Sequence, residues 1–137
     1  MQKKDTGKIK VLLSKLGLDV HNRGLITVAK MLRDSGMEVI YLGNALPDEI
    51  ISIALQEDAD VIGVSSLGGA HLTLGKDLID LAIEKGLKDG TIFIIGGIFS
   101  VEDHQKLKDT GFDDVFTAGA TRDEIVGSIS RLVRARV

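Results

Sequence analysis

The alternation of apolar and amphipathic segments constrains the fold of this 137-residue chain more than any other feature. Apolar runs rich in β-branched residues occupy 9–14, 38–42, 60–65, 91–95 and 114–116. Amphipathic runs with apolar residues at helical spacing follow them, at about 24–35, 47–57, 73–85, 101–110 and 122–135. Strands that alternate with helices form a parallel sheet with right-handed crossovers. We therefore predict one α/β domain over residues 1–137, a flavodoxin-like (Rossmann-like) five-stranded parallel sheet of order 2-1-3-4-5 with helices on both faces.

The residues between these segments are those expected at helix ends. Pro47 stands at the first turn of the second predicted helix, where its missing N–H costs nothing. A capping-box pattern begins at Thr121 and predicts the start of the last helix. Gly36, Gly86 and Gly111 each close a helical run, and we expect a left-handed backbone conformation there.

Composition excludes several classes of function. The formal net charge of −3 gives no electrostatic reason to expect nucleic acid or an anionic membrane as a partner. No apolar run approaches the roughly 20 residues of a membrane span, and the polar N-terminal residues lack the apolar core of a signal peptide. The chain has no Cys, so thiolate metal sites and Cys nucleophiles are excluded. We expect a cytoplasmic protein.

The segment between the first strand and the first helix carries the pattern Asp19-x-His21-x-x-Gly24. A carboxylate two residues before a histidine accepts a hydrogen bond from one imidazole nitrogen and leaves the other nitrogen as a metal ligand. One His and one Asp hold a free ion poorly, so the pattern favours an axial ligand to a metal carried inside a cofactor. The interaction of Asp19 with His21 forms a relay. Lys15 extends this relay if its ammonium group keeps the Asp19 carboxylate ionised.

Two further unusual segments follow neighbouring strands of the predicted sheet. Ser65 and the pair Gly68-Gly69 come after the third strand, and Gly96-Gly97 comes after the fourth. In this fold, ligands bind beyond the carboxyl ends of the strands, where the strand order reverses between strands 1 and 3. Glycine pairs at this edge are most simply explained by a bulky planar group that lies against the backbone.

Other candidate residues are predicted to have structural roles. His71 is expected to be a local cap at the start of the third helix, and His104 a solvated residue of a charged helix. Asp113-Asp114 resembles a turn pair before the last strand. A receiver domain needs an Asp at the end of strand 3, where Ser65 stands, and no strand is followed by a G-x-G-x-x-G or P-loop pattern.

Together these motifs resemble the signature of the cobalamin-binding domain of adenosylcobalamin-dependent mutases, and the similarity covers essentially the whole chain. The signature reads here Asp19-x-His21-x-x-Gly24, then Ser65-x-Leu67, then Gly96-Gly97. Within that family the chain looks most like the acyl-CoA mutases, and methylmalonyl-CoA mutase above all. It departs from them after the last strand, where Phe116 to Thr121 replaces a Tyr followed by Pro-Gly-Thr.

The resemblance implies a base-off cofactor, in which His21 replaces the cofactor's own dimethylbenzimidazole as the lower axial ligand of cobalt. Asp19 would orient His21, with Lys15 behind it, and the nucleotide tail would enter a groove. The contacts with adenosylcobalamin that the resemblance implies are Asp19, His21, Asn22, Arg23, Gly24, Val28, Ser65, Leu67, Gly69, Gly96, Gly97, Phe116 and Thr121.

The same resemblance implies a partner, because the chain has no substrate-binding apparatus of its own. In the family, a (β/α)8 barrel that binds acyl-CoA covers the upper face of the cofactor. We therefore expect the small subunit of an acyl-CoA mutase, an isomerase whose barrel lies on a separate large subunit. The alternatives are a non-enzymatic cobalamin carrier or sensor, a small subunit of the glutamate mutase type, and a flavodoxin-like domain with a degenerate motif.

Overall fold

The structure, a computed structural model, describes residues 8–16, 23–66, 71–117 and 119–136. Its strands form one parallel sheet of order β2-β1-β3-β4-β5, which confirms the predicted flavodoxin-like topology. The strands are β1 (Lys10–Leu16), β2 (Glu38–Ala45), β3 (Val61–Ser66), β4 (Ile92–Gly97) and β5 (Asp114–Thr117).

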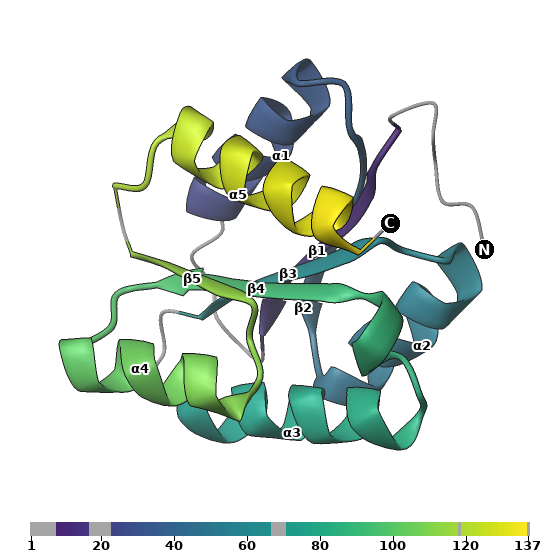
Figure 1. The fold of residues 1–137 in the computed structure, drawn as a ribbon, viewed down its shortest axis with the longest axis vertical. Helices are drawn as coiled ribbons and strands as arrows, with labels where there is room; N and C mark the ends of the chain where they lie inside the picture. The colour runs from purple at the N-terminus through teal and green to yellow at the C-terminus, as the bar shows by residue number, and fades with distance from the viewer. Residues whose placement is uncertain (1–7, 17–22, 67–70, 118, 137) are drawn as a thin grey trace.

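Helices cover both faces of this sheet (Figure 1). One face carries α1 (Arg23–Asp34) and α5 (Arg122–Ala135). The other carries α2 (Pro47–Glu57), α3 (His71–Glu84) and α4 (Val101–Thr110). Within the described ranges, none of the helices has the length and apolar character of a membrane span.

Each face of the sheet has its own hydrophobic core, because successive residues of a strand point to opposite faces. In β1, for example, Val11 and Leu13 pack under α1 and α5, whereas Leu12 packs under the other three helices. The central strands β1, β3 and β4 therefore carry consecutive apolar residues at 11–13, 61–64 and 92–95, as expected for strands buried on both sides.

The helix ends follow the sequence prediction. Gly36, Gly86 and Gly111 have φ values of 92°, 73° and 134°. A Cβ atom at Gly111 would also lie 2.9 Å from Cγ2 of Ile79, so packing and backbone conformation both require glycine there. Pro47 is the first residue of α2, and Thr121 caps α5 with the expected capping box.

Element boundaries differ from the prediction mainly at the carboxyl edge of the sheet. β1 and β2 run on to Leu16 and Ala45, with a register shift opposite Leu13 and Ser14. Gly96 and Gly97, predicted to follow the fourth strand, are instead its last two residues. A short 3₁₀ turn at Lys88–Gly90, labelled η1, precedes β4 and was not predicted. β1 and β2 extend because the backbone of each strand finds a partner in the other as far as Leu16 and Ala45. The hydrophobic pattern of a single segment does not reveal such pairing.

Candidate functional site

Four of the predicted site residues lie in one register row across neighbouring strands. Lys15 on β1 pairs with Ser65 on β3, Ser65 pairs with Gly96 on β4, and Gly96 pairs with Phe116 on β5. The row lies near the carboxyl ends of the strands. Because side chains alternate along a strand, Ser65 shares its face with Gly63, and Gly96 shares its face with Ile94, toward α1 and α5. The parallel sheet thus brings together residues that are up to a hundred positions apart.

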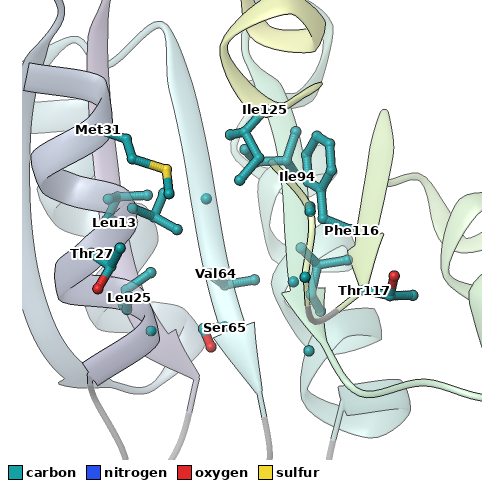
Figure 2. A pocket seen from close by; sticks show the side chains of 18 of the residues that line it. Leu13, Leu25, Thr27, Met31, Val64, Ser65, Ile94, Phe116, Thr117 and Ile125 are labelled. Atoms are coloured by element: carbon teal, nitrogen blue, oxygen red, sulfur yellow. The ribbon is translucent and has the colours of Figure 1, made fainter. Parts of the chain in front are cut away.

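A cavity of about 520 Å³ opens above this row, between the sheet and the helices α1 and α5 (Figure 2). Its lining comes from β1, α1, β3, β4, β5 and the first turn of α5. The predicted site residues among the lining are Gly24, Val28, Ser65, Gly96, Gly97 and Phe116. The cavity therefore unites the contributions of six segments at the edge where this fold binds ligands.

Two glycines keep part of this space open. A Cβ atom built on Gly24 would meet no heavy atom within 4 Å, and one on Gly96 would meet only the carbonyl oxygen of Phe116, at 3.7 Å. Packing against the protein therefore does not require glycine at either position. Both residues line the cavity, so the absence of a side chain leaves open space against the backbone there.

Gly97 has a different explanation. A Cβ atom there would lie 2.3 Å from the carbonyl oxygen of Ser66 and 2.7 Å from Cζ of Phe99. The interpretation of the Gly96-Gly97 pair as two positions cleared for a planar ligand is therefore not needed for Gly97, and for Gly96 it stays a prediction. The second glycine is needed because the backbone of β3 and the ring of Phe99 approach it closely.

Lys15 is buried, with a relative exposure of 1%. Lys15 is thus not a solvated lysine at the end of its strand. An ammonium group is removed from water at considerable cost unless a charged or polar group compensates it. Asp19, the predicted partner of Lys15, lies outside the described residues.

The remaining predicted contacts are distributed as follows. Gly24 and Val28 lie on α1 and line the cavity, and Arg23 is the first residue of that helix. Thr121 is not among the lining residues. Its Oγ1 accepts a hydrogen bond from the backbone N–H of Glu124 at 3.2 Å, and its own N–H donates to Oε1 of Glu124 at 2.7 Å. The hydrogen bond from the backbone N–H of Thr121, and then hydrogen bonding by its side chain, hold the pKa of the exposed Glu124 carboxyl below its ordinary value.

The loops with the strongest sequence motifs lie outside the described residues. They carry Asp19, His21 and Asn22 in segment 17–22, and Leu67 and Gly69 in segment 67–70. The strands that precede them, β1 and β3, are neighbours and end at the same edge of the sheet. The roles predicted for these five residues remain predictions.

Two of the structural predictions for the other polar residues need correction. His71 is no local cap, because its Nε2 lies 2.8 Å from Oδ2 of Asp103 on α4. His104 is half-buried and not fully solvated. Asp113 and Asp114 do have structural roles. Asp113 accepts a hydrogen bond from the backbone N–H of Phe93, and Asp114 accepts one from the hydroxyl of Ser128.

The chemistry of the lining favours binding over acid–base catalysis. None of the described lining residues is titratable, and the polar side chains among them are Thr27, Ser65 and Thr117. Groups of three or more His, Asp or Glu that could hold a metal ion are absent from the part of the chain that the structure describes. The described lining is therefore suited to a mainly apolar ligand.

Sequence reasoning missed the inner end of the cavity. Leu13, Met31, Ile94 and Ile125 line it, yet all four are apolar residues at positions typical of core strands and helices. Gly63, between Leu13 and Ile94 in the register, carried a weak signal, because glycine inside a buried strand often marks a close approach.

Comparisons with known proteins find related sequences over nearly the whole chain. The model of the B12 binding domain matches residues 9–126. The small subunit of 2-hydroxyisobutanoyl-CoA mutase from Aquincola tertiaricarbonis is 43% identical over 133 residues, which cover 96% of this chain and 97% of that protein. The small subunit of pivalyl-CoA mutase from Xanthobacter autotrophicus is 40% identical over 129 residues, 93% of this chain and 85% of that protein.

Solved structures show the same fold in proteins of different function. A cobalamin-binding protein from Desulfitobacterium hafniense superposes with a TM-score of 0.76 at 22% identity, covering 96% of this chain and 60% of that one. A Francisella receiver domain superposes almost as well, with a TM-score of 0.75 at 18% identity over 95% of this chain and all of that one. At these identities the superpositions establish the fold alone.

The sequence matches, by contrast, establish relatedness over nearly the whole chain and confirm its resemblance to the cobalamin-binding small subunits of acyl-CoA mutases. The chain therefore belongs to the B12-binding domain family.

Proposed function

We propose that this chain is the small subunit of an adenosylcobalamin-dependent acyl-CoA mutase and holds the cofactor base-off with His21 as the axial ligand of cobalt. The observation that carries the proposal is the row from Lys15 through Ser65 and Gly96 to Phe116, above which the cavity opens. Identities of 40% and 43% to small subunits of two acyl-CoA mutases support the class of reaction.

The residues of the cavity fit the nucleotide tail of such a cofactor. Gly24 and Gly96 leave space against backbone, and the side chains of Ser65 and Thr117 lie near the carboxyl edge, where the polar part of the tail would enter (Figure 2). The inner end is apolar and suits an aromatic base. When bound, adenosylcobalamin supplies a cobalt–carbon bond whose homolysis starts a radical rearrangement of the carbon skeleton.

The role of this chain in the reaction is to bind and orient. Asp19 would accept a hydrogen bond from one nitrogen of His21 and would leave the other nitrogen to hold cobalt. Lys15, which is buried at the end of β1, would stabilise the charge of Asp19. The burial of Lys15 supports this relay because a buried ammonium group needs an anionic or polar partner.

The acyl-CoA would be bound by a second protein. The described cavity lining contains no titratable residue, so it offers no acid or base for substrate chemistry. Radical chemistry also requires that water be excluded from the upper face of the cofactor. We therefore propose a large (β/α)8 barrel subunit that binds acyl-CoA and closes over the carboxyl edge. A cytoplasmic location fits this assignment and stays a prediction.

The axial ligand is tested by electron paramagnetic resonance of the cob(II)alamin complex, with protein uniformly labelled with nitrogen-15. The wild-type chain should show coupling from one protein nitrogen, and His21→Ala should lose it while the circular dichroism spectrum is retained. His104→Ala, on the helix α4 across the sheet, is the matched control and should keep the coupling. Unchanged coupling in His21→Ala would contradict the assignment.

The mutase assignment is tested separately by affinity copurification from the source organism. A large subunit should copurify, and acyl-CoA isomerisation should require both chains together with adenosylcobalamin. Cobalamin binding by a chain for which no copurifying protein restores turnover would instead favour a carrier or sensor.

A further inference from the structure

We infer that Asn44 is a positioning residue of the proposed site, whose amide side chain holds the ammonium group of Lys15 in place from the neighbouring strand β2. The inference rests on the proposed function, because it concerns how Lys15 is kept available to Asp19. It is carried by an irregularity in the pairing of β1 with β2 and by the burial of Lys15.

Strand β2 contains a β-bulge close to the carboxyl edge of the sheet. Leu13 on β1 pairs with Tyr41. The next residue, Ser14, pairs with Gly43, so the register passes over Leu42. Gly43 has a φ of 79°, and a Cβ atom there would meet no heavy atom within 4 Å. Glycine is therefore required by the backbone conformation of the bulge and not by packing.

A buried hydroxyl group fixes this bulge. Oγ of Ser14 lies 2.9 Å from the carbonyl oxygen of Gly43 and 3.1 Å from that of Lys15. Ser14 is fully buried, so water does not compete for these contacts. The bulge is thus anchored to β1 at the residue that precedes Lys15.

The bulge decides which residue of β2 lies opposite Lys15. With it, Lys15 pairs with Asn44, and Leu16 pairs with Ala45. Leu16 and Ala45 both belong to the core under α2, α3 and α4. Because side chains alternate along a strand, Lys15 and Asn44 both face the side of α1 and α5. Without the bulge, β2 would be displaced by one residue, and Asn44 would point into the apolar core opposite Leu16.

Lys15 is flanked in the sheet by two polar residues, Asn44 on β2 and Ser65 on β3. The preceding residue of β1 on this face is Leu13, which pairs with Gly63, and neither offers a side-chain acceptor. An ammonium group has three donors and is costly to bury without acceptors. Since β2 is the edge strand, Asn44 keeps one side in water and offers its amide oxygen toward β1.

The amide of Asn44 accepts a hydrogen bond without carrying a charge. It therefore fixes the position of the ammonium group and leaves its charge available to Asp19. A carboxylate at position 44 would instead form an ion pair with Lys15 and weaken the effect of Lys15 on Asp19. A neutral acceptor is thus the kind of side chain that a positioning role requires.

The test is a double-mutant cycle on the binding of cob(II)alamin, measured by equilibrium dialysis with the purified chain. Asn44→Ala should weaken binding about 10-fold, at the lower end of the range for groups that support a metal ligand. In the Lys15→Met background the same substitution should have almost no effect, because the group that Asn44 positions is gone. The nitrogen coupling in the cob(II)alamin spectrum should change in Asn44→Ala as well.

Gln56→Ala removes an exposed amide from α2 and is the matched control, which should bind cob(II)alamin as the wild-type chain does. Asn44 is itself exposed, so Asn44→Ala should unfold in urea at a midpoint close to that of the wild type. Asn44→Asp has a side chain of the same shape and should also weaken binding, because its carboxylate neutralises Lys15. It decides the question if Asn44→Ala fails to fold.

Wild-type affinity in either Asn44 variant would overturn the inference and leave the proposed function intact. Equal losses on Asn44→Ala in the wild-type and Lys15→Met backgrounds would also overturn it, because Asn44 would then not act through Lys15. Failure of the wild-type chain to bind cob(II)alamin would overturn the proposed function itself.

Discussion

His71 and Asp103 join the first turns of two neighbouring helices. Nε2 of His71, at the start of α3, lies 2.8 Å from Oδ2 of Asp103 on α4, and their side chains are 11% and 25% exposed. The ring of Phe99 lies with its centroid 4.7 Å from that of the imidazole, at an interplanar angle of 52°. Phe99 also packs against Gly97 at the end of β4. The pair of His71 and Asp103 therefore fixes the segment between β4 and α4 against the end of the sheet.

Removal of either partner should therefore destabilise the domain. We expect His71→Ala and Asp103→Ala each to lower the free energy of unfolding by about 1 kcal/mol, because each leaves a partly buried polar group without its partner. The double variant should cost clearly less than the sum of the two single variants. Urea denaturation measures all three.

The exposed pair of Lys30 and Asp34 on α1 provides the control. Their side chains are 77% and 59% exposed, so Asp34→Asn should change stability by less than about 0.5 kcal/mol. Strict additivity of the His71 and Asp103 variants would show that the two side chains do not interact.

Gly96 and Gly97 should respond in opposite ways to the same substitution. Gly97→Ala introduces a methyl group against the carbonyl oxygen of Ser66 and should cost about 1–3 kcal/mol of stability. Gly96→Ala has room on the protein side, so stability should stay within about 0.5 kcal/mol while cobalamin binding weakens. Thermal unfolding and equilibrium dialysis separate the two effects, and wild-type cobalamin affinity in Gly96→Ala would remove that residue from the site.

Tyr41 carries a buried hydroxyl group that has no hydrogen-bond partner among the described residues. Tyr41→Phe removes the desolvated oxygen without changing the packing of the ring on the α1 side. We expect the free energy of unfolding to rise by up to about 1 kcal/mol.

Ser14→Ala is the matched control, because that buried hydroxyl group donates to the carbonyl oxygen of Gly43 at 2.9 Å. Its loss should lower stability by about 1 kcal/mol. Both variants are compared with wild type by urea denaturation. A loss of stability in Tyr41→Phe would mean that the hydroxyl group finds a partner in solution.

Lys15→Met should leave the stability of the cofactor-free protein nearly unchanged while it weakens cofactor binding. Methionine fills a similar volume and needs no compensating charge, so the cofactor-free protein should lose no more than about 1 kcal/mol. If Lys15 acts through Asp19 on His21, the affinity for cobalamin should fall by about 10- to 100-fold. The nitrogen coupling in the cob(II)alamin spectrum should also change. Unaltered affinity and coupling in this variant would leave Lys15 with a structural role only.

The order of strands and helices was predictable from the sequence because the signals are local. Helical spacing of apolar residues, the capping box at Thr121 and the glycines after helices each depend on a few neighbouring positions. The approach of Ser65, Gly96 and Phe116 was predictable too, because neighbouring parallel strands end at one edge of a sheet.

Tertiary structure alone decided the rest. The partner of His71 lies 32 residues away, and the need for glycine at position 97 comes from Phe99 and from the backbone of another strand. The inner end of the cavity is lined by Leu13, Met31, Ile94 and Ile125, residue types that equally fill a solid core. An apolar side chain encodes its preference to leave water, but whether it then meets another side chain or an open space depends on how the elements pack.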